Sequence, residues 1–129
     1  MAHPNEAVVR AGFAAFDAGD VDTLRQLMAP DVVWHAPGRS PVSGTFKGID
    51  EVLSYFGRLA TITDGTFKAE VHDIVGNEEH VFAAYIATGR RGSRTLRDGA
   101  VLLFHVEEQR ITQAWLLVGD QYAVDAFFS

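Results

Sequence analysis

Two acidic or basic side chains in this sequence could move protons near neutral pH without a cofactor. An imidazole exchanges protons near neutrality, so His35, near the end of the β-branched and aromatic segment 31–36, is a candidate general acid or base. Asp120 follows a second such segment, and beside His35 it would orient the imidazole in a pair that needs no metal. Strand alternation puts Trp34 and His35 on opposite faces, so His35 could instead lie at a cavity rim or on the back of a sheet. Asp120 could instead cap a terminal helix.

Further side chains could bind a substrate by hydrogen bonds or by apolar contact. Tyr55 and Tyr85 fall on apolar faces and could each offer a hydroxyl to a ligand oxygen, or could simply pack with that hydroxyl bonded elsewhere. Arg39 follows Pro37-Gly38 and could clamp a carboxylate or phosphate, or could be solvated. The side chains expected to form apolar walls of the site are Phe13, Phe16, Trp34, Leu102 and Phe104.

Composition excludes several classes of site and partner. The chain has no cysteine, and its 5 histidines show neither His-x-His nor His-Glu-x-x-His spacing, so we expect no metal and no cofactor. The formal charge is -6 and no window is rich in Lys and Arg, which argues against nucleic acid as a partner. The longest apolar run, 81–87, is far shorter than the ~20 residues that cross a bilayer. The first residues show no leader, which predicts a soluble, cytoplasmic protein.

The elements that must position these residues begin with two helices. Val9, Phe13 and Phe16 recur at helical spacing within 4–18, which predicts a first helix that ends at Ala-Gly-Asp. A short second helix is expected over 20–29, capped by its aspartate and ended by the proline that follows. The two helices would form a hairpin.

The rest of the chain is predicted to be mostly strand. Residues 31–36 form a short strand, followed by a loop up to residue 48 and a third helix over 50–61 that Asp50 caps. Four longer strands, separated by short polar turns, are then expected to pair as antiparallel hairpins. They span 66–75, 80–90, 94–106 and 111–119, and a short helix over 120–128 closes the chain.

This order predicts an α+β fold for one domain, residues 1–129. Three N-terminal helices would pack on a strongly curved mixed or antiparallel sheet and form a cone. A helical layer over a bent sheet leaves a cavity lined by the first helix, the third helix and inward strand residues. We therefore expect a small hydrophobic molecule to bind inside the cone.

The opposite face of the sheet is predicted to meet a second subunit. Strand alternation places Trp115 there with Ile111, Gln113 and Leu117. Neighbouring strands add further apolar residues such as Leu103 to this face. Since an apolar sheet face is costly to leave in water, we expect a homodimer.

A family resemblance rests on three segments of the chain. They are 16–20 (Phe-Asp-Ala-Gly-Asp), 31–48 with its Pro-Gly-x-Ser-Pro-x-x-Gly loop, and the closing 120–128. On these residues the chain resembles SnoaL-like proteins of the nuclear transport factor two-like superfamily, over nearly its whole length. The resemblance implies the cone fold. It does not select one activity, because members include ketosteroid isomerases, polyketide cyclases, epoxide hydrolases, dehydratases and ligand-binding domains.

The catalytic residues of those members are not matched in this chain. The positions that the resemblance aligns with the tyrosine, base and protonated aspartate of ketosteroid isomerases hold Phe13, Ala36 and Leu102, none of which transfers protons. For an epoxide hydrolase, the candidates are Arg97 and Asp98. The Arg-Asp-Gly context of Asp98 is more typical of a bulge or strand kink.

These observations predict a cofactor-independent enzyme that acts on a small hydrophobic substrate by general acid/base proton transfer. It would be of cyclase, isomerase, dehydratase or hydrolase type, with His35 and Asp120 handling protons. The alternative is a non-catalytic domain that binds a hydrophobic ligand or mediates dimerisation. The apolar residues at the three isomerase positions favour that alternative.

Overall fold

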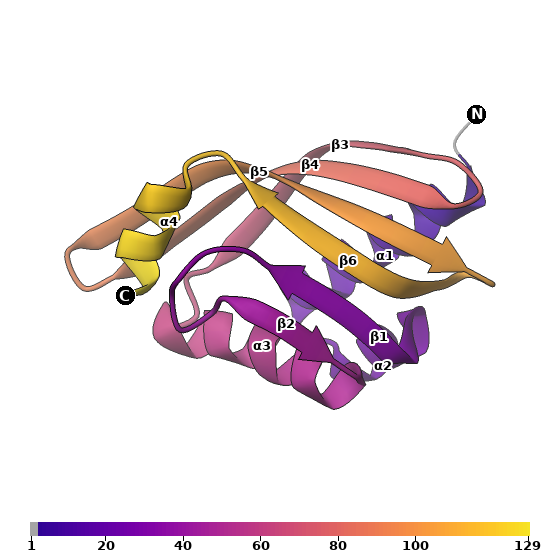
Figure 1. Cartoon of the computed structure of the whole chain (residues 1–129), viewed down its shortest axis with the longest axis horizontal. Helices are drawn as coiled ribbons and strands as arrows, with labels where there is room; N and C mark the ends of the chain where they lie inside the picture. The colour runs from indigo at the N-terminus through magenta and orange to yellow at the C-terminus, as the bar shows by residue number, and fades with distance from the viewer. Residues whose placement is uncertain (1–2) are drawn as a thin grey trace.

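The computed structural model describes residues 3–129, so the first two residues of the predicted domain lie outside the described part of the chain. Helices and strands combine in an α+β arrangement, with the strands in one sheet (Figure 1). The helices are α1 (Pro4–Ala18), α2 (Val21–Leu27), α3 (Ile49–Ile62) and α4 (Gln121–Phe128). The strands are β1 (Met28–Ala36), β2 (Gly44–Lys47), β3 (Lys68–Gly76), β4 (His80–Arg91), β5 (Arg94–Glu107) and β6 (Arg110–Val118).

The sheet is six-stranded, mixed and open. Its order is β2-β1-β6-β5-β4-β3, and every neighbouring pair is antiparallel except β1 and β6, which run parallel. The parallel pair joins early and late segments of the chain, so Trp34 lies opposite Ala114 and His35 opposite Trp115. The three N-terminal helices contact this sheet, α1 through β3 and β4, α2 through β1, and α3 through β1 and β2. The predicted α+β fold is thus confirmed.

The first helix begins and ends at capping residues. The backbone N–H of Asn5 donates to His3 Nδ1 at 3.1 Å, and Glu6 Oε2 accepts from the His3 backbone N–H at 3.3 Å. This capping box satisfies two N–H groups that a helix start leaves unpaired. At the other end Gly19 takes a left-handed conformation (φ 67°), which glycine adopts without strain. The predicted bounds of this helix, 4–18, are confirmed.

Two boundaries near the second helix differ from the prediction. The helix α2 ends at Leu27 and β1 already begins at Met28, so Pro30 lies inside a strand rather than after a helix. The pairing of β1 with β6 is irregular between Met28 and Val33. Proline has no backbone N–H to donate to a neighbouring strand, and it is tolerated at this position because the pairing is interrupted there.

Two features of the following segment also differ. Part of the predicted loop forms the short strand β2, which pairs antiparallel with β1. The third helix begins at Ile49 with Gly48 as its N-cap, so Asp50 lies within the first turn and does not cap it. A carboxylate in the first turn still interacts favourably with the helix dipole.

Alternation along β5 separates an inner face from an outer face of the sheet. Leu96, Asp98, Ala100, Leu102 and Phe104 are buried, while the residues between them are exposed or half-buried. The β5–β6 register shifts between His105 and Val106. Because of that bulge, Ile111 is buried on the inner side, and its predicted place on the outer face is wrong.

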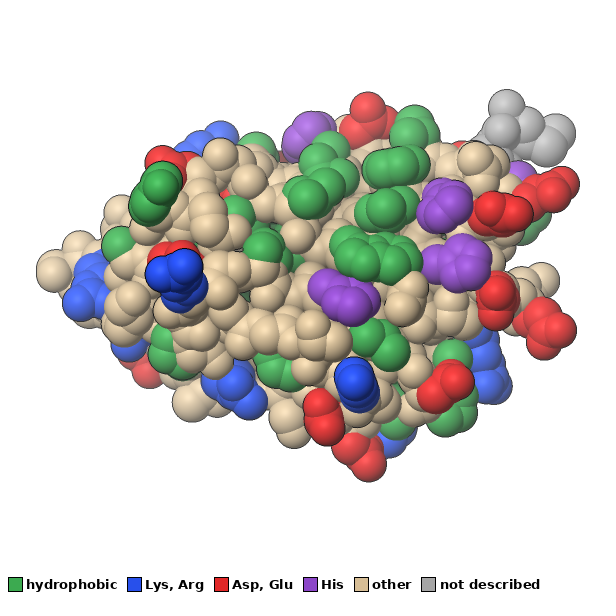
Figure 2. Space-filling model, in the orientation of Figure 1, with side chains coloured by type: hydrophobic (Ala, Val, Ile, Leu, Met, Phe, Trp, Pro, Cys, Tyr) green, Lys and Arg blue, Asp and Glu red, His purple; other side chains and the backbone are tan. Residues whose placement is uncertain are grey.

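The outer face carries a continuous apolar row. Trp115 lies opposite Leu103, Leu103 opposite Phe82, and Phe82 opposite Val75 on the edge strand. Phe82 is 45% exposed. Figure 2 shows hydrophobic side chains gathered on this face with histidine side chains beside them. The face has the apolar character on which the homodimer prediction depends, and the association itself stays a prediction.

Candidate functional site

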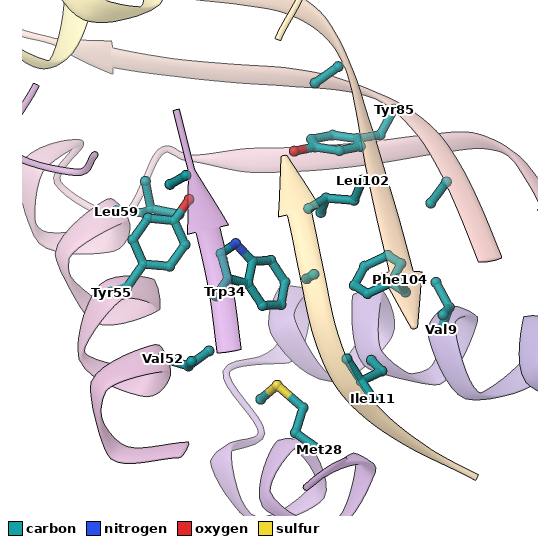
Figure 3. Close-up of a cluster of buried hydrophobic side chains, with 14 of the residues drawn as sticks. Val9, Met28, Trp34, Val52, Tyr55, Leu59, Tyr85, Leu102, Phe104 and Ile111 are labelled. Carbon is teal, nitrogen blue, oxygen red and sulfur yellow. The ribbon is translucent and has the colours of Figure 1, made fainter. Parts of the chain in front are cut away.

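A cavity of about 100 Å³ lies between the inner face of the sheet and the helices. Helix α4 and the loop that follows β1 also contribute to its wall. Figure 3 shows part of this lining, with aromatic and aliphatic side chains from β1, α3 and the long strands turned toward one another. The lining includes, from helices, Val9, Phe13, Phe16, Tyr55, Phe56, Leu59, Val124 and Phe128, and from strands, Met28, Trp34, Ala36, Tyr85, Leu96, Asp98, Ala100, Leu102, Phe104, Ile111 and Leu116.

Aromatic rings from several elements pack together in the wall. The ring of Phe13 lies 5.6 Å from that of Tyr85 and 6.1 Å from that of Phe104. The Trp34 indole packs edge-on against Phe56, with 4.9 Å between ring centroids. The predicted wall residues Phe13, Phe16, Trp34, Leu102 and Phe104 therefore all line this cavity, as do both predicted hydrogen-bonding tyrosines.

The two tyrosines in the wall keep their protons. Burial raises the pKa of Tyr55 far above its ordinary value, with a smaller opposing effect from the nearby indole N–H of Trp34. Burial also raises the pKa of Tyr85, and repulsion from Tyr55, once that group is ionised, and from Asp98 raises it further. Both hydroxyl groups are neutral at physiological pH and are available as hydrogen-bond donors.

One carboxylate reaches the cavity, that of Asp98 on β5. Its residue is only 7% exposed, and no other Asp or Glu of the described chain lines the cavity. Its Oδ2 accepts from the Gly119 backbone N–H at 3.1 Å, and Oδ1 accepts from the Asp120 backbone N–H at 3.0 Å. These amides fix the carboxylate at the junction of β6 and α4. Each oxygen retains acceptor capacity for a ligand, since a carboxylate offers about four lone-pair sites.

His35 lies on the other side of the sheet. Its ring stacks on Trp115 with 5.4 Å between centroids and 9° between planes, and its Nδ1 lies 3.5 Å from Thr45 Oγ1. It is not among the cavity-lining residues. The reason is the alternation of β1, which turns Trp34 inward and its neighbour outward.

Asp120 and Arg39 also lie outside the cavity lining. The Asp120 side chain accepts from the Ala123 backbone N–H at 3.1 Å and caps α4, so the strand alternation that was expected to turn it inward ends before it. The expected pair of His35 with Asp120 over the cavity does not form. Arg39 is exposed, and its backbone N–H donates to Asp125 Oδ1 at 3.2 Å.

Asp98 is the residue that sequence reasoning undervalued. The alternation that places Leu102 and Phe104 inward places Asp98 on the same face, so strand parity was the signal that could have found it. The bulge expected at Arg-Asp-Gly is absent, since β4 and β5 pair without a register shift and Asp98 lies opposite Ala87.

The other candidate chemistries find little support in the described residues. The positions that the family resemblance aligned with isomerase catalytic residues, Phe13, Ala36 and Leu102, do line the cavity and are all apolar. Within residues 3–129 no three His, Asp or Glu side chains gather in a way that could hold a metal ion.

No helix of residues 3–129 is long and apolar enough to cross a membrane.

Comparison with known proteins identifies relatives across the whole chain. An uncharacterized protein of Mycobacterium tuberculosis is 33% identical over 123 residues, which are 95% of this chain and 94% of that protein. The structure of Bal32a, from a soil-derived mobile gene cassette, is 34% identical with a TM-score of 0.95, and covers 98% of this chain and 97% of its own.

A more distant structural neighbour has a proposed activity. IdmH of Streptomyces antibioticus, a proposed polyketide cyclase, has a TM-score of 0.76 at 23% identity, covering 90% of this chain and 92% of its own. At that identity the likeness concerns the fold alone. The SnoaL-like domain model matches residues 9–114. Since this match spans most of the sequence, the chain belongs to the SnoaL-like family.

Proposed function

We propose that this protein is a cofactor-independent enzyme that moves a proton on a small, mostly apolar molecule, with Asp98 as the general base and acid. The observation that carries the proposal is a single buried carboxylate in an otherwise apolar cavity. A buried carboxylate is costly to desolvate, and besides its structural hydrogen bonds to the Gly119 and Asp120 amides it keeps acceptor capacity toward the cavity. Asp98 replaces His35 and Asp120 as the candidate for proton transfer.

The geometry supports abstraction of a proton from a carbon next to a carbonyl group. The C–H bond would break, its proton would pass to a carboxylate oxygen of Asp98, and its electron pair would move onto the carbonyl oxygen as an enolate. The neutral hydroxyls of Tyr55 and Tyr85 are donors for that developing charge. Return of the proton to another carbon would complete an isomerisation, and attack of the enolate on a second carbonyl would close a ring.

The comparisons support a reaction of this class. SnoaL-like neighbours include proteins named as proposed polyketide cyclases, which points to a cyclase or isomerase type of role on a small molecule. These neighbours share the fold at low identity, so the base is argued from the cavity of this chain and not from theirs.

A non-catalytic ligand-binding domain is the second candidate. The apolar side chains at the three isomerase positions are compatible with it, because they cannot transfer protons. The two candidates differ in one respect that can be measured. A binding domain holds its ligand unchanged, whereas a proton-transfer enzyme exchanges the protons of a suitable ligand with water.

The test uses cyclopentanone in D2O as a minimal substrate. Nuclear magnetic resonance follows replacement of its α-hydrogens by deuterium in the presence of the wild-type protein. The proposal predicts catalysed exchange that Asp98→Asn lowers on the order of 100-fold, because an amide cannot take up the proton. Equal exchange rates in both proteins would refute Asp98 as the base.

Asp120→Asn is the matched control. It makes the same chemical change one residue beyond Gly119, outside the cavity, and asparagine caps a helix about as well as aspartate. We expect it to leave exchange unchanged. If Asp120→Asn loses exchange while Asp98→Asn keeps it, the result would instead support Asp120 as the proton-transfer residue, as the sequence predicted.

A further inference from the structure

Three hydrogen-bond donors reach the cavity from three separate elements. Trp34 belongs to β1, Tyr55 to α3 and Tyr85 to β4. Figure 3 shows the indole nitrogen and both hydroxyl oxygens directed toward the same part of the cavity. The indole ring of Trp34 lies 6.2 Å from the Tyr55 ring, and Tyr55 and Asp98 both lie near enough to Tyr85 to raise its pKa, so these groups are close to one another.

The indole N–H is the donor that most clearly lacks a partner. Trp34 is 6% exposed, and its Nε1 is buried and makes no hydrogen bond of ordinary geometry to the described residues, although the Tyr55 hydroxyl lies near enough for the indole to lower the pKa of that group slightly. Buried polar groups in folded proteins are almost always hydrogen-bonded, and an unsatisfied one costs about 1–3 kcal/mol. An acceptor atom on a ligand would remove that cost. A cationic ligand such as an amine would not, because an ammonium group supplies donors only.

The charges of the lining argue against an anionic ligand. No Lys, Arg or His is among the cavity-lining residues of the described chain, and the acidic side chain of Asp98 is among them. A carboxylate or phosphate would enter an apolar space beside a second negative charge, with no cation to offset it. The ligand is therefore expected to be neutral.

The size of the cavity limits the ligand further. Its volume of about 100 Å³ is smaller than the ~150 Å³ cavity that takes up benzene in a well-studied case. A single five-membered ring, or a six-membered ring with small adjustments of the wall, fills the enclosed part of this cavity, which is partly open to solvent.

We propose that the cavity selects a neutral, single-ring carbonyl compound whose oxygen accepts hydrogen bonds from the Trp34 indole and the two tyrosine hydroxyls. This inference rests on the proposed function, since it names the substrate class of the same site. In this arrangement the carbon next to the carbonyl lies beside Asp98, which is near enough to Tyr85 to raise the pKa of that tyrosine. Trp34 thereby becomes a specificity-determining residue.

The two tryptophans of the chain allow a direct test, because each gives one indole N–H signal in a nitrogen-15 correlation spectrum. Trp115 lies on the outer face of the sheet and serves as an internal control, and Trp115→Phe assigns the two signals. Titration with cyclopentanone is expected to shift the Trp34 signal downfield and to leave the Trp115 signal in place. A shift of Trp115 alone would overturn the inference.

Two analogues separate oxygen recognition from simple filling of the cavity. Methylenecyclopentane replaces the oxygen by a CH2 group and is expected to bind roughly tenfold more weakly than cyclopentanone. Cyclopentanecarboxylate carries a charge at neutral pH and is expected not to shift the Trp34 signal. Equal binding of the hydrocarbon, or tighter binding of the carboxylate, would contradict the inference.

Trp34→Phe keeps an aromatic ring and removes the N–H. In this variant the ketone is expected to lose its roughly tenfold advantage over the hydrocarbon. If the variant does not fold, the comparison of the three ligands in the wild-type protein still decides the matter. Binding of the ketone at Trp34 without α-deuterium exchange would support the ligand class and refute the proposed function. Exchange without a shift of the Trp34 signal would support the proposed function and refute the ligand class.

Discussion

Asp98→Asn should destabilise the protein more than any other isosteric Asp→Asn exchange near the cavity. The carboxylate accepts two backbone N–H groups, from Gly119 at 3.1 Å and from Asp120 at 3.0 Å. The amide of asparagine has one oxygen, so only one of these N–H groups keeps an acceptor. The other would face the NH2 group of the new side chain, which is itself a donor.

The expected size of the effect follows from these contacts. A buried N–H left without a partner costs about 1–3 kcal/mol, and the remaining hydrogen bond weakens when its acceptor loses its charge. Removal of a buried negative charge offsets part of this loss. We therefore expect a net loss of about 2 kcal/mol in the free energy of unfolding. For a domain of this size that is roughly 6–10 °C in Tm. The variant should remain folded, because domains are typically stable by about 5–15 kcal/mol.

Urea unfolding followed by circular dichroism measures this difference, with Asp120→Asn as the matched control. That control should lie within about 0.5 kcal/mol of wild type, because asparagine retains the N-cap hydrogen bond to Ala123. Equal stabilities of the two variants would show that the two amide contacts do not hold Asp98 in solution. A more stable Asp98→Asn variant would show that the buried charge outweighs its hydrogen bonds.

Three further predictions concern backbone packing, alkaline stability and association. Gly119→Ala should lose about 1–3 kcal/mol in unfolding free energy, since a Cβ there would lie 2.7 Å from the Gly99 backbone oxygen. Gly57→Ala, at an exposed helical position with open space around it, should instead raise the unfolding free energy by about 1 kcal/mol. A stabilising Gly119→Ala or a destabilising Gly57→Ala would contradict the packing seen at these positions. Burial raises the pKa values of Tyr55 and Tyr85 above 10.0, so their protonated forms stabilise the fold fully below pH 10. As pH rises further, stability should fall by about 1.4 kcal/mol per pH unit for each tyrosine, measured by urea unfolding, and a flat profile would refute their burial. Replacement of Phe82 by aspartate on the outer apolar row should turn the expected homodimer into a monomer in sedimentation velocity, and a wild-type monomer would disprove the dimer itself.

Much of the fold could be predicted from local patterns in the sequence. The long hairpin of β4 and β5 followed from alternating apolar residues on either side of a short polar turn, and the structure confirms it. The first helix followed from the spacing of Val9, Phe13 and Phe16 and from its terminal signals. Strand β2 and the bulge near His105 could not be predicted, because both depend on pairing with segments far away in the chain.

The candidate site shows the same division between local and long-range information. Strand alternation correctly separated Trp34 from His35, and the sequence then offered no local reason to discard His35. Asp98 has the inward parity of its strand, yet its place between Arg97 and Gly99 is more typical of a bulge or strand kink. Only the amides of Gly119 and Asp120, which lie between β6 and α4 and are brought to Asp98 by the fold, show that a carboxylate can be held there.

The central claim is that Asp98 takes a proton from a molecule bound in the cavity. The most direct test measures α-deuterium exchange of cyclopentanone by wild-type and Asp98→Asn proteins at concentrations where the Trp34 indole signal shows both cavities to be occupied. The account predicts that both proteins bind the ketone and that exchange falls on the order of 100-fold in the variant. Equal exchange at equal occupancy, or no exchange in the wild-type protein while the ketone is bound, would contradict it.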